Sequence, residues 1–423
     1  MPSKRKTTAA KKEAKPSLVP KLRFPEFREG EPWKEEAGSS LFDQINDRNP
    51  EPGLPVLAIT QEHGAIPRHM IDYHVSVTEK SIESYKVVQV GDFIISLRSF
   101  QGGIEYSRYH GICSPAYVIL RRRGGGSSEY FRHYLKTDRF IRILTKNLEG
   151  LRDGKMISYA QFSELQLPVP KPAEQQKIAE CLSSVDEVIA AQARKVDALK
   201  THKKGLMQQL FPREGETQPR LRFPEFQNAG DWEEVALSEI VEVASGQVDP
   251  KEPPYRDYPQ IGSENIESNT GKLVNVKSAG EKGVISGNYL FDENDVLYSK
   301  IRPALNKAAA PDFAGICSAD IYPIRPANDG LLRNYLLYLL LSDKFLEHAI
   351  RSSDRGKIPK INREDLLGYV AVIPKPAEQH RIASCLSSLD ALIAAEMQKH
   401  AALQRHKRGL MQQFFPSPEE VEA

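Results

Sequence analysis

Residues 170–212 read PKPAEQQKIAECLSSVDEVIAAQARKVDALKTHKKGLMQQLFP, and residues 374–416 read PKPAEQHRIASCLSSLDALIAAEMQKHAALQRHKRGLMQQFFP. The two segments align without a gap, and 28 of the 43 positions are identical. Pro172 and Pro376 stand where a first helical turn would begin, and Pro212 and Pro416 stand where the helices would stop, because proline is tolerated in a first turn but not in a helix interior. The chain is therefore predicted to contain one long helix twice. About 37 residues at a rise of 1.5 Å would give a rod of roughly 55 Å.

Apolar residues recur along both helices at alternating intervals of three and four, which is typical of a coiled coil. Polar residues recur in register as well, Gln192 with Glu396 and Lys203 with Lys407, and buried polar positions can fix the register of pairing. We expect the helices to pair antiparallel with each other; the alternative is an amphipathic helix that packs on its own domain. The predicted helix-pairing seam consists of Ile178, Leu182, Val185, Ile189, Val196, Leu199, Leu206, Ile382, Leu386, Leu389, Ile393, Leu403 and Leu410.

A second motif also occurs twice: LRFPEF at 22–27 returns at 221–226, with Trp33 and Trp232 at the same distance behind it. Between the shared motifs, the interiors 34–168 and 233–372 differ greatly. Similar frames around different interiors indicate one fold that is used twice to recognise two different things. The interiors still match in islands, namely Gly111–Ser114 with Gly315–Ser318, Asp92 with Asp295, and Gly154-Lys155 with Gly356-Lys357.

The interiors are predicted to be mixed and rich in strands, because short β-branched runs alternate with Gly, Asn and Asp. Such runs lie at 87–90, 93–95, 117–120 and 295–298, and each interior closes with a helical stretch, at 130–144 and 331–350. The predicted fold class is α+β, with two pseudo-symmetric strand-rich domains joined by two long antiparallel coiled-coil helices. The expected segments are a basic tail at 1–19, a first domain at 20–169, a helix at 170–212, a linker and second domain at 213–373, a second helix at 374–416, and a tail at 417–423.

Charge is concentrated at the N-terminus. The 423 residues carry a formal net charge of +2, while residues 1–20 hold six Lys or Arg against Glu13. The remainder is therefore slightly acidic, so net charge does not argue for nucleic acid. The tail is either a solubilising extension or a weak attraction to phosphates.

The cysteines form two pairs of equivalent positions, Cys113 with Cys317 and Cys181 with Cys385, each 204 residues apart. Their number thus reflects the duplication rather than a disulfide framework. With no signal peptide and no apolar run of membrane-spanning length in the sequence, we expect four reduced thiols in a cytoplasmic protein.

In their order, these motifs resemble the specificity subunits of type I restriction–modification enzymes, over nearly the whole of 20–416. The motifs are LRFPEF, the PxPxxxEQxxIA lead into each helix, GLMQQxFP at its end, PVLAITQ at 55–61 and VLYSKIRP at 296–303. The resemblance implies two target recognition domains, each reading half of a split site in double-stranded DNA. It also implies helices that dock two modification subunits, with two restriction subunits in the full complex. S-adenosylmethionine, ATP and Mg²⁺ would be used by those partners, and none would be bound by this chain.

Motifs for catalysis were sought and not found. Glu252-Pro-Pro-Tyr255 is nearest to an adenine methyltransferase loop, but Glu stands where the flipped base would be bound, so a turn is the better interpretation. Residues 150–156 lack the length and the Ser or Thr of a phosphate loop, and no histidine has the spacing of a zinc ligand. The chain is predicted to be non-catalytic by itself. A self-sufficient DNA adenine methyltransferase and a coiled-coil scaffold without a DNA role are the alternatives.

Reading bases needs amides and bidentate donors on loops, and clamping phosphates needs Arg, Lys and small hydroxyls. Arg121, Arg122 and Arg123 are interpreted instead as a solvated face. If both domains face one side of B-DNA, their half-site centres would lie about one helical turn, roughly 10 bp, apart. The candidate DNA-binding residues are Thr60, Gln61, Arg98, Ser99, Gln101, Arg152 and Lys155 in the first domain and Ser263, Asn265, Lys300, Arg302, Lys307, Arg355, Lys357 and Lys360 in the second.

Overall fold

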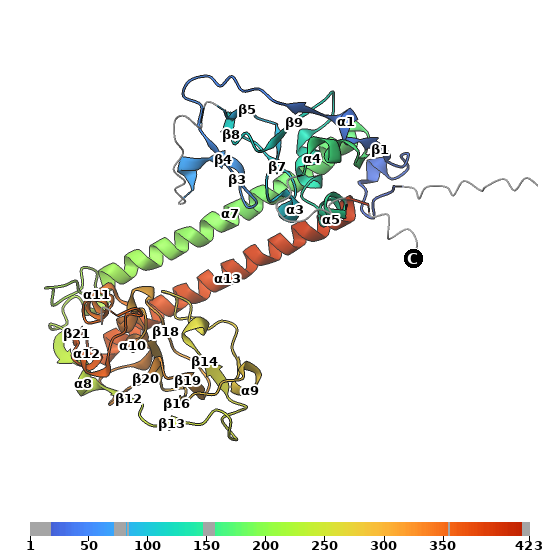
Figure 1. Cartoon of the computed structure of the whole chain (residues 1–423). Coiled ribbons are helices and arrows are strands. Elements are labelled where there is room, and N and C mark those ends of the chain that lie inside the picture. The colour runs from blue at the N-terminus through green and yellow to red at the C-terminus, as the bar shows by residue number, and fades with distance from the viewer. Residues whose placement is uncertain (1–17, 72–81, 83, 147–156, 354–355, 417–423) are drawn as a thin grey trace, which may run out of the picture. The chain divides into compact units, whose positions relative to one another are not determined.

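The structure is a computed structural model, and it describes residues 18–71, 82, 84–146, 157–353 and 356–416 (Figure 1). The chain divides into two compact units, which are Met1–Gln192 with Lys399–Ala423, and Ala193–Gln398. Each unit therefore contains one half of each long helix, α7 (Pro172–Leu210) and α13 (Pro376–Phe414). None of the helices in the described ranges is long and apolar enough to span a membrane.

The first unit is built on short antiparallel strands. Its largest sheet has four strands in the order β2-β9-β6-β7, and three two-stranded sheets pair β1 with β10, β3 with β4 and β5 with β8. The strands are β1 (Lys34–Ala37), β2 (Phe42–Ile45), β3 (Leu57–Thr60), β4 (Gly64–Pro67), β5 (Lys86–Val88), β6 (Phe93–Ile95), β7 (Glu105–Tyr106), β8 (Gly111–Cys113), β9 (Val118–Arg122) and β10 (Gln166–Val169). The helices are η1 (Pro25–Phe27), α1 (Gly38–Leu41), η2 (Arg68–Met70), α3 (Ser99–Gly102), α4 (Ser128–Tyr134), α5 (Asp138–Lys146) and α6 (Tyr159–Ser163).

The second unit repeats this plan with a larger second sheet. The order β12-β20-β17-β18 corresponds to the four-stranded sheet of the first unit, β11 pairs with β21, and a five-stranded sheet has the order β13-β16-β19-β14-β15. The strands are β11 (Glu233–Ala236), β12 (Val241–Val243), β13 (Gln247–Val248), β14 (Pro259–Ile261), β15 (Lys277–Ser278), β16 (Asn288–Phe291), β17 (Val296–Ser299), β18 (Ala308–Ala309), β19 (Gly315–Ser318), β20 (Ile321–Pro326) and β21 (Val370–Ile373). The helices are η3 (Pro224–Phe226), α8 (Leu237–Ile240), η4 (Ser263–Asn265), α9 (Ala279–Lys282), η5 (Pro303–Leu305), α10 (Arg333–Leu341), α11 (Asp343–Arg351) and α12 (Arg363–Leu367).

These elements confirm the predicted α+β class and the duplication. The predicted closing stretches at 130–144 and 331–350 are helical, and each consists of two helices. Thr137 and Ser342 stand at the breaks, where their hydroxyls accept hydrogen bonds from the backbone N–H of Phe140 (3.2 Å) and Phe345 (3.4 Å). A hydroxyl in this position caps a new helix, so the chain changes direction instead of continuing.

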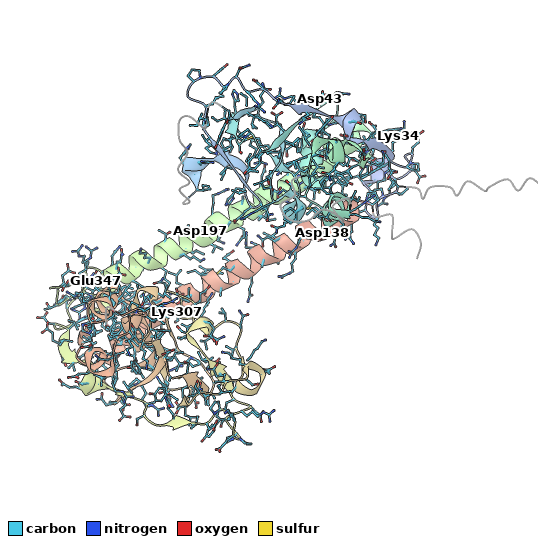
Figure 2. The ribbon with its side chains drawn as sticks, in the orientation of Figure 1. Lys34, Asp43, Asp138, Asp197, Lys307 and Glu347 are labelled. Carbon is cyan, nitrogen blue, oxygen red and sulfur yellow. The ribbon has the colours of Figure 1, made fainter. Side chains whose placement is uncertain are left out.

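The two long helices pair antiparallel, as predicted. In the second unit, Lys195 Nζ lies 2.5 Å from Glu396 Oε1, and Lys203 Nζ lies 2.6 Å from Asp390 Oδ1, so the position on α13 falls as the position on α7 rises. Off the seam, Asp197 projects from α7 into solvent (Figure 2). Every predicted seam residue is buried or half-buried: Ile178, Leu182, Val196, Ile382, Leu386 and Ile393 are buried, and Val185, Ile189, Leu199, Leu206, Leu389, Leu403 and Leu410 are half-buried.

The ends of the helices belong to the domain cores. In the first unit, Phe415, which directly follows α13, packs on the rings of Tyr130 and Tyr134 with centroids 5.5 Å apart in both cases. In the second unit, Phe211, directly after α7, stacks on Tyr335, also at 5.5 Å. The seam therefore has two partners. The ends of the seam pack on the domains, as in the alternative of an amphipathic helix that packs on its own domain. In the middle of the seam, α7 and α13 pair with each other.

Candidate nucleic-acid interface

The two repeated motifs hold each other together. Arg23 of the first LRFPEF motif donates from Nε and Nη2 to the two carboxylate oxygens of Glu174, at 2.8 Å each. Arg222 makes the same two bonds to Glu378, also at 2.8 Å. All four side chains are at least nine-tenths buried, and fork-to-fork pairing of this kind fixes geometry as well as charge. The shared sequence thus maintains a frame, and the differing loops are mounted on it.

A second repeated ion pair lies inside each four-stranded sheet. Buried Asp92 accepts two hydrogen bonds from the Arg121 guanidinium at 2.8 Å, and Asp295 accepts two from Arg325 at 2.9 Å. These pairs explain why Asp92 and Asp295 match in otherwise divergent interiors.

The interpretation of residues 121–123 as a solvated face holds for the exposed Arg123 but was wrong for the half-buried Arg121 and Arg122. Arg121 holds the buried aspartate, Arg122 is half-buried with its guanidinium 4.5 Å from the Phe131 ring centroid, and Arg123 pairs with Asp43. The arginines have these partners because β9 pairs directly with β2 and β6.

In the second unit, two distant segments form one basic surface. The backbone N–H of Arg302 donates to Pro359 O at 2.7 Å, and that of Ile361 donates to Lys300 O at 2.9 Å. These bonds place the loop after β17 beside the segment before α12. Arg302, Lys357 and Lys360 are exposed, and the Lys300 ammonium lies 5.1 Å from the Tyr322 ring centroid. Four of the predicted DNA-binding cations are thus brought to one place.

Three other predicted residues of the second unit are used inside the protein. The Ser263 hydroxyl bonds the Ser299 hydroxyl at 2.8 Å, and Lys307 Nζ donates to Ser263 O at 2.7 Å. Asn265 is 3% exposed, and its amide donates to Val274 O and Asn275 O. These bonds hold the turn η4; Asn265 is buried, and Ser263 and Lys307 are half-buried.

The first unit shows the same division between exposed and internal residues. Gln61, Arg98 and Gln101 are exposed, and Gln61 Nε2 donates to Arg98 O at 3.3 Å, so the loop after β3 touches the loop after β6. By contrast, Thr60 bonds within its own turn, and Ser99 is 1% exposed and accepts from Ser96 N. The remaining predicted residues, Arg152, Lys155 and Arg355, lie outside the described residues.

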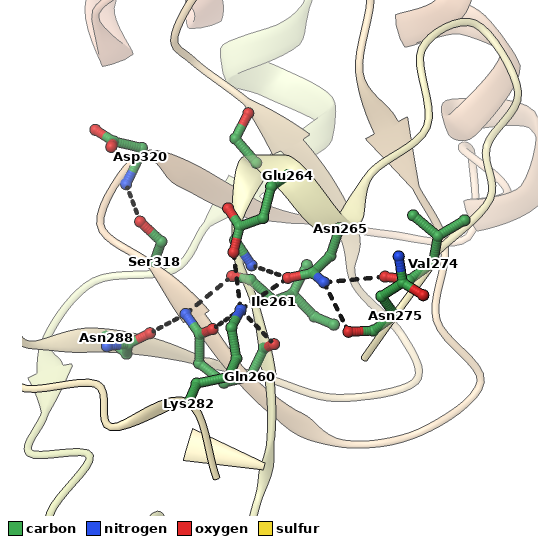
Figure 3. A network of polar contacts seen from close by, with 12 residues as sticks. Gln260, Ile261, Glu264, Asn265, Val274, Asn275, Lys282, Asn288, Ser318 and Asp320 are labelled. Atoms are coloured by element: carbon green, nitrogen blue, oxygen red, sulfur yellow. Dashed lines mark hydrogen bonds and ion pairs between the residues drawn. The ribbon is translucent and has the colours of Figure 1, made fainter. Parts of the chain in front are cut away.

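Sequence reasoning missed Glu264 and Lys282. Lys282 Nζ donates to Glu264 Oε1 at 2.8 Å, to Asn265 Oδ1 at 2.9 Å and to Gln260 Oε1 at 2.5 Å, which joins α9 to the turn η4 (Figure 3). Glu264 is an acceptor, whereas the residue types expected to contact bases and phosphates were amides, hydroxyls and cationic donors. Its position directly after Ser263, as Gln61 follows Thr60, was the signal that could have found it.

Glu252–Tyr255 forms a turn, as interpreted from the sequence, with Arg256 N donating to Glu252 O at 3.1 Å. The four cysteines are free, and burial raises the pKa of Cys113 to about 12 and also raises that of Cys317, so these thiols stay protonated. Within the described ranges, no group of three His, Cys, Asp or Glu side chains could hold a metal ion.

Comparison with known proteins gives consistent matches. A family model described as Type I restriction modification DNA specificity domain matches residues 42–201 and 229–405. The chain is 27% identical over 325 residues to the type I restriction enzyme EcoDI specificity subunit of Escherichia coli, covering 68% of this chain and 71% of that protein. It is 23% identical to the MjaVIII specificity subunit of Methanocaldococcus jannaschii, covering 80% of each.

Solved structures match in fold. The S subunit of a type I restriction-modification system from M. genitalium aligns with a TM-score of 0.53 at 15% identity, covering 95% of this chain and 100% of that one. A chain from a structure on complex assembly and conformational transition of the type I R-M system aligns with a TM-score of 0.54 at 18% identity, covering 91% and 98%.

Proposed function

Because this chain belongs to the type I restriction modification DNA specificity domain family, we propose that each of its two units reads one half of a bipartite, asymmetric DNA target. The observation that carries the proposal is the contrast between frame and loops. The ion pairs Arg23–Glu174 and Arg222–Glu378 are the same in both units. The loops after equivalent strands present different polar side chains, Gln61, Arg98 and Gln101 in one unit and Glu264, Lys300 and Arg302 in the other.

The exposed groups suit DNA. Arg and Lys contact phosphates and can also donate to guanine, and an amide can read adenine. In the second unit, Arg302, Lys357 and Lys360 are exposed and would supply the phosphate contacts that position the protein. This local clustering, rather than the net charge, supports a DNA-binding role.

The long helices would have two further roles. They would set the unread gap between half-sites, and their surfaces outside the seam would dock two modification subunits, because the repeat supplies the same surface twice. Two restriction subunits would complete the complex. Methylation and cleavage, with their S-adenosylmethionine, ATP and Mg²⁺, would be carried out by the partners. Purified chain incubated with DNA and S-adenosylmethionine should transfer no methyl groups; measurable transfer would instead support the methyltransferase alternative.

A domain exchange tests the central proposal. Residues 34–168 are replaced by the corresponding interior of another specificity subunit, and the target is determined by methylome sequencing of a host that also carries the modification subunit. The first half of the target should change while the second is retained. The reciprocal exchange of residues 233–372 serves as the control and should change only the second half. A chimera that altered both halves together would contradict two independent readers, and unaltered targets in both exchanges would favour a scaffold.

A further inference from the structure

Glu264 and Gln61 occupy equivalent places in the two units. Gln61 directly follows β3 and Glu264 lies in the turn η4 after β14, and each side chain lies over a glycine. A Cβ on Gly262 would meet the Glu264 carboxylate oxygens at 2.3 Å, and a Cβ on Gly102 would meet Gln61 Cδ at 2.7 Å. Each side chain thus lies against the backbone in a fixed orientation. Gln61 ends in an amide, and Glu264 ends in a carboxylate.

The Glu264 carboxylate is held from one side and open on the other. Lys282 bonds it at 2.8 Å, and the same ammonium also bonds the side-chain oxygens of Gln260 and Asn265 (Figure 3). The Lys282 side chain is 19% exposed, whereas that of Glu264 is 67% exposed. Partial burial opposes ionisation of Glu264, but the Lys282 ammonium outweighs it and lowers the pKa of the carboxyl. Glu264 is therefore a fixed, ionised acceptor that faces solvent.

This anion stands next to the basic surface of the second unit. The turn that carries it is tied to the end of β17 by the Ser263–Ser299 hydroxyl bond, and the Lys307 ammonium donates to Ser263 O. Lys300 and Arg302 follow β17 directly. A carboxylate at this place repels phosphates and lowers general affinity for DNA, so beyond holding Lys282 it would act on DNA through a contact with a base.

The hydrogen-bonding groups of the base pairs limit which base the Glu264 carboxylate can contact. An ionised carboxylate only accepts hydrogen bonds, and in the major groove the amino donors are cytosine N4 and adenine N6. Adenine presents the N7 acceptor beside its amino group, and N7 would repel the second carboxylate oxygen. Cytosine has no acceptor at that edge, so it is the better partner.

We propose that Glu264 is a specificity-determining residue of the second unit and accepts a hydrogen bond from the N4 amine of a cytosine in the second half-site. The proposal rests on the proposed function and adds the identity of one read base. Lys282 acts as the positioning residue that keeps the carboxylate in place.

The test compares wild-type full chain, Glu264→Gln and Glu293→Gln, each assembled with the modification subunit. DNA with randomised half-sites is selected by binding and sequenced. Wild type should require cytosine at one position of the second half-site. Glu264→Gln should relax that preference by about ten- to a hundredfold, because one good base contact discriminates by about that factor, and it should leave the first half-site unchanged. Glu293 is exposed and precedes β17, at the other end of that strand from Lys300, so Glu293→Gln removes the same charge and should select the wild-type target.

The outcomes are distinguishable. If Glu264→Gln selects the wild-type second half-site, the carboxylate only anchors Lys282 and the inference is overturned, while the proposed function stands. If wild type itself selects no second half-site, the proposed function fails first. A loss of melting temperature together with loss of both half-sites would show a structural role and would also overturn the inference. Glu264→Asp, which keeps the charge but withdraws it by one methylene, should weaken the cytosine preference without changing the identity of the base.

Discussion

Lys203 and Asp390 form a buried ion pair between α7 and α13 in the second unit. Lys203 Nζ lies 2.6 and 2.8 Å from the two Asp390 oxygens, and the Tyr338 hydroxyl donates to the same carboxylate at 2.8 Å. The Lys203 side chain is 7% exposed and that of Asp390 is 21% exposed. Asp390→Ala would leave a buried ammonium without its counterion and a phenol without its acceptor.

The expected loss is about 3 kcal/mol of unfolding free energy. Breaking a fully buried pair costs about 3–5 kcal/mol, and the partial exposure of Asp390 admits water and places the loss at the lower end. Replacing both residues, as Lys203→Met with Asp390→Leu, removes both charges and should recover most of the loss, with the Tyr338 hydroxyl, still without its acceptor, accounting for the remainder. Glu214→Ala removes the exposed Arg351 pair of the same unit and should have no measurable effect.

The two tryptophans provide the assay. Trp33 lies in the first unit and Trp232 in the second, and both are 5% exposed. In a Trp33→Phe background, urea unfolding followed by fluorescence therefore reports on the second unit. A loss below about 1 kcal/mol for Asp390→Ala would show that the pair is screened by solvent. A double variant as unstable as the single one would show that charge burial is not the cause.

Three further expectations concern the helices and the first unit. Burial, with Arg132, Lys407 and Arg108 nearby, lowers the pKa of His133 to about 2. Near pH 6.5 the histidine of the unfolded chain takes up a proton, whereas that of the folded chain does not. The first unit should therefore lose stability as the pH falls below 6.5, by up to about 1.4 kcal/mol per pH unit. His133→Gln should flatten this dependence in urea titrations of a Trp232→Phe chain, and an unchanged slope would refute the assignment. Inserting four residues near Gln192 adds about 6 Å of helix and should lengthen the unread gap by about one base pair while both half-sites are kept. Methylation at the original spacing by a folded mutant would show that the helices do not set the length of the gap. Native mass spectrometry at saturating partner should give two modification subunits per chain, and a limit of one would count against equivalent docking surfaces.

The fold was largely predictable from the sequence because each repeated motif supports the same structural prediction in both halves of the chain. A seven-residue apolar pattern over about five heptads has few structural solutions, and prolines mark both helix ends. The break at Thr137 was not predictable from apolar spacing, since α4 and α5 both continue the helical pattern. The hydroxyl of Thr137 caps the new helix α5 after α4 has ended at Tyr134.

The candidate site was predictable only in part. Residue type and loop position located Gln61, Arg98 and Arg302 on exposed loops, but they also selected Ser99 and Asn265, whose side chains satisfy buried backbone groups. A polar side chain after a strand can either face solvent or satisfy a buried backbone group. Which of the two it does depends on three-dimensional packing. Glu264 shows the reverse error, because its place next to Lys282 is created by α9, and Lys282 lies 18 residues further along the chain.

The contact of Phe415 with Tyr130 and Tyr134 has a consequence for how the protein is made. The core of the second unit draws on residues between Leu206 and Leu386, whereas the core of the first unit needs Phe414 and Phe415 in addition to residues 18–182. At about 5–20 residues per second of synthesis, the first unit waits roughly ten seconds or more, while the whole second unit is translated, before its last aromatic side chains emerge. The ribosome thus completes the C-terminal unit before the N-terminal one, and the parts of the Tyr130 and Tyr134 rings that Phe415 covers stay open on the nascent chain until the final helix arrives.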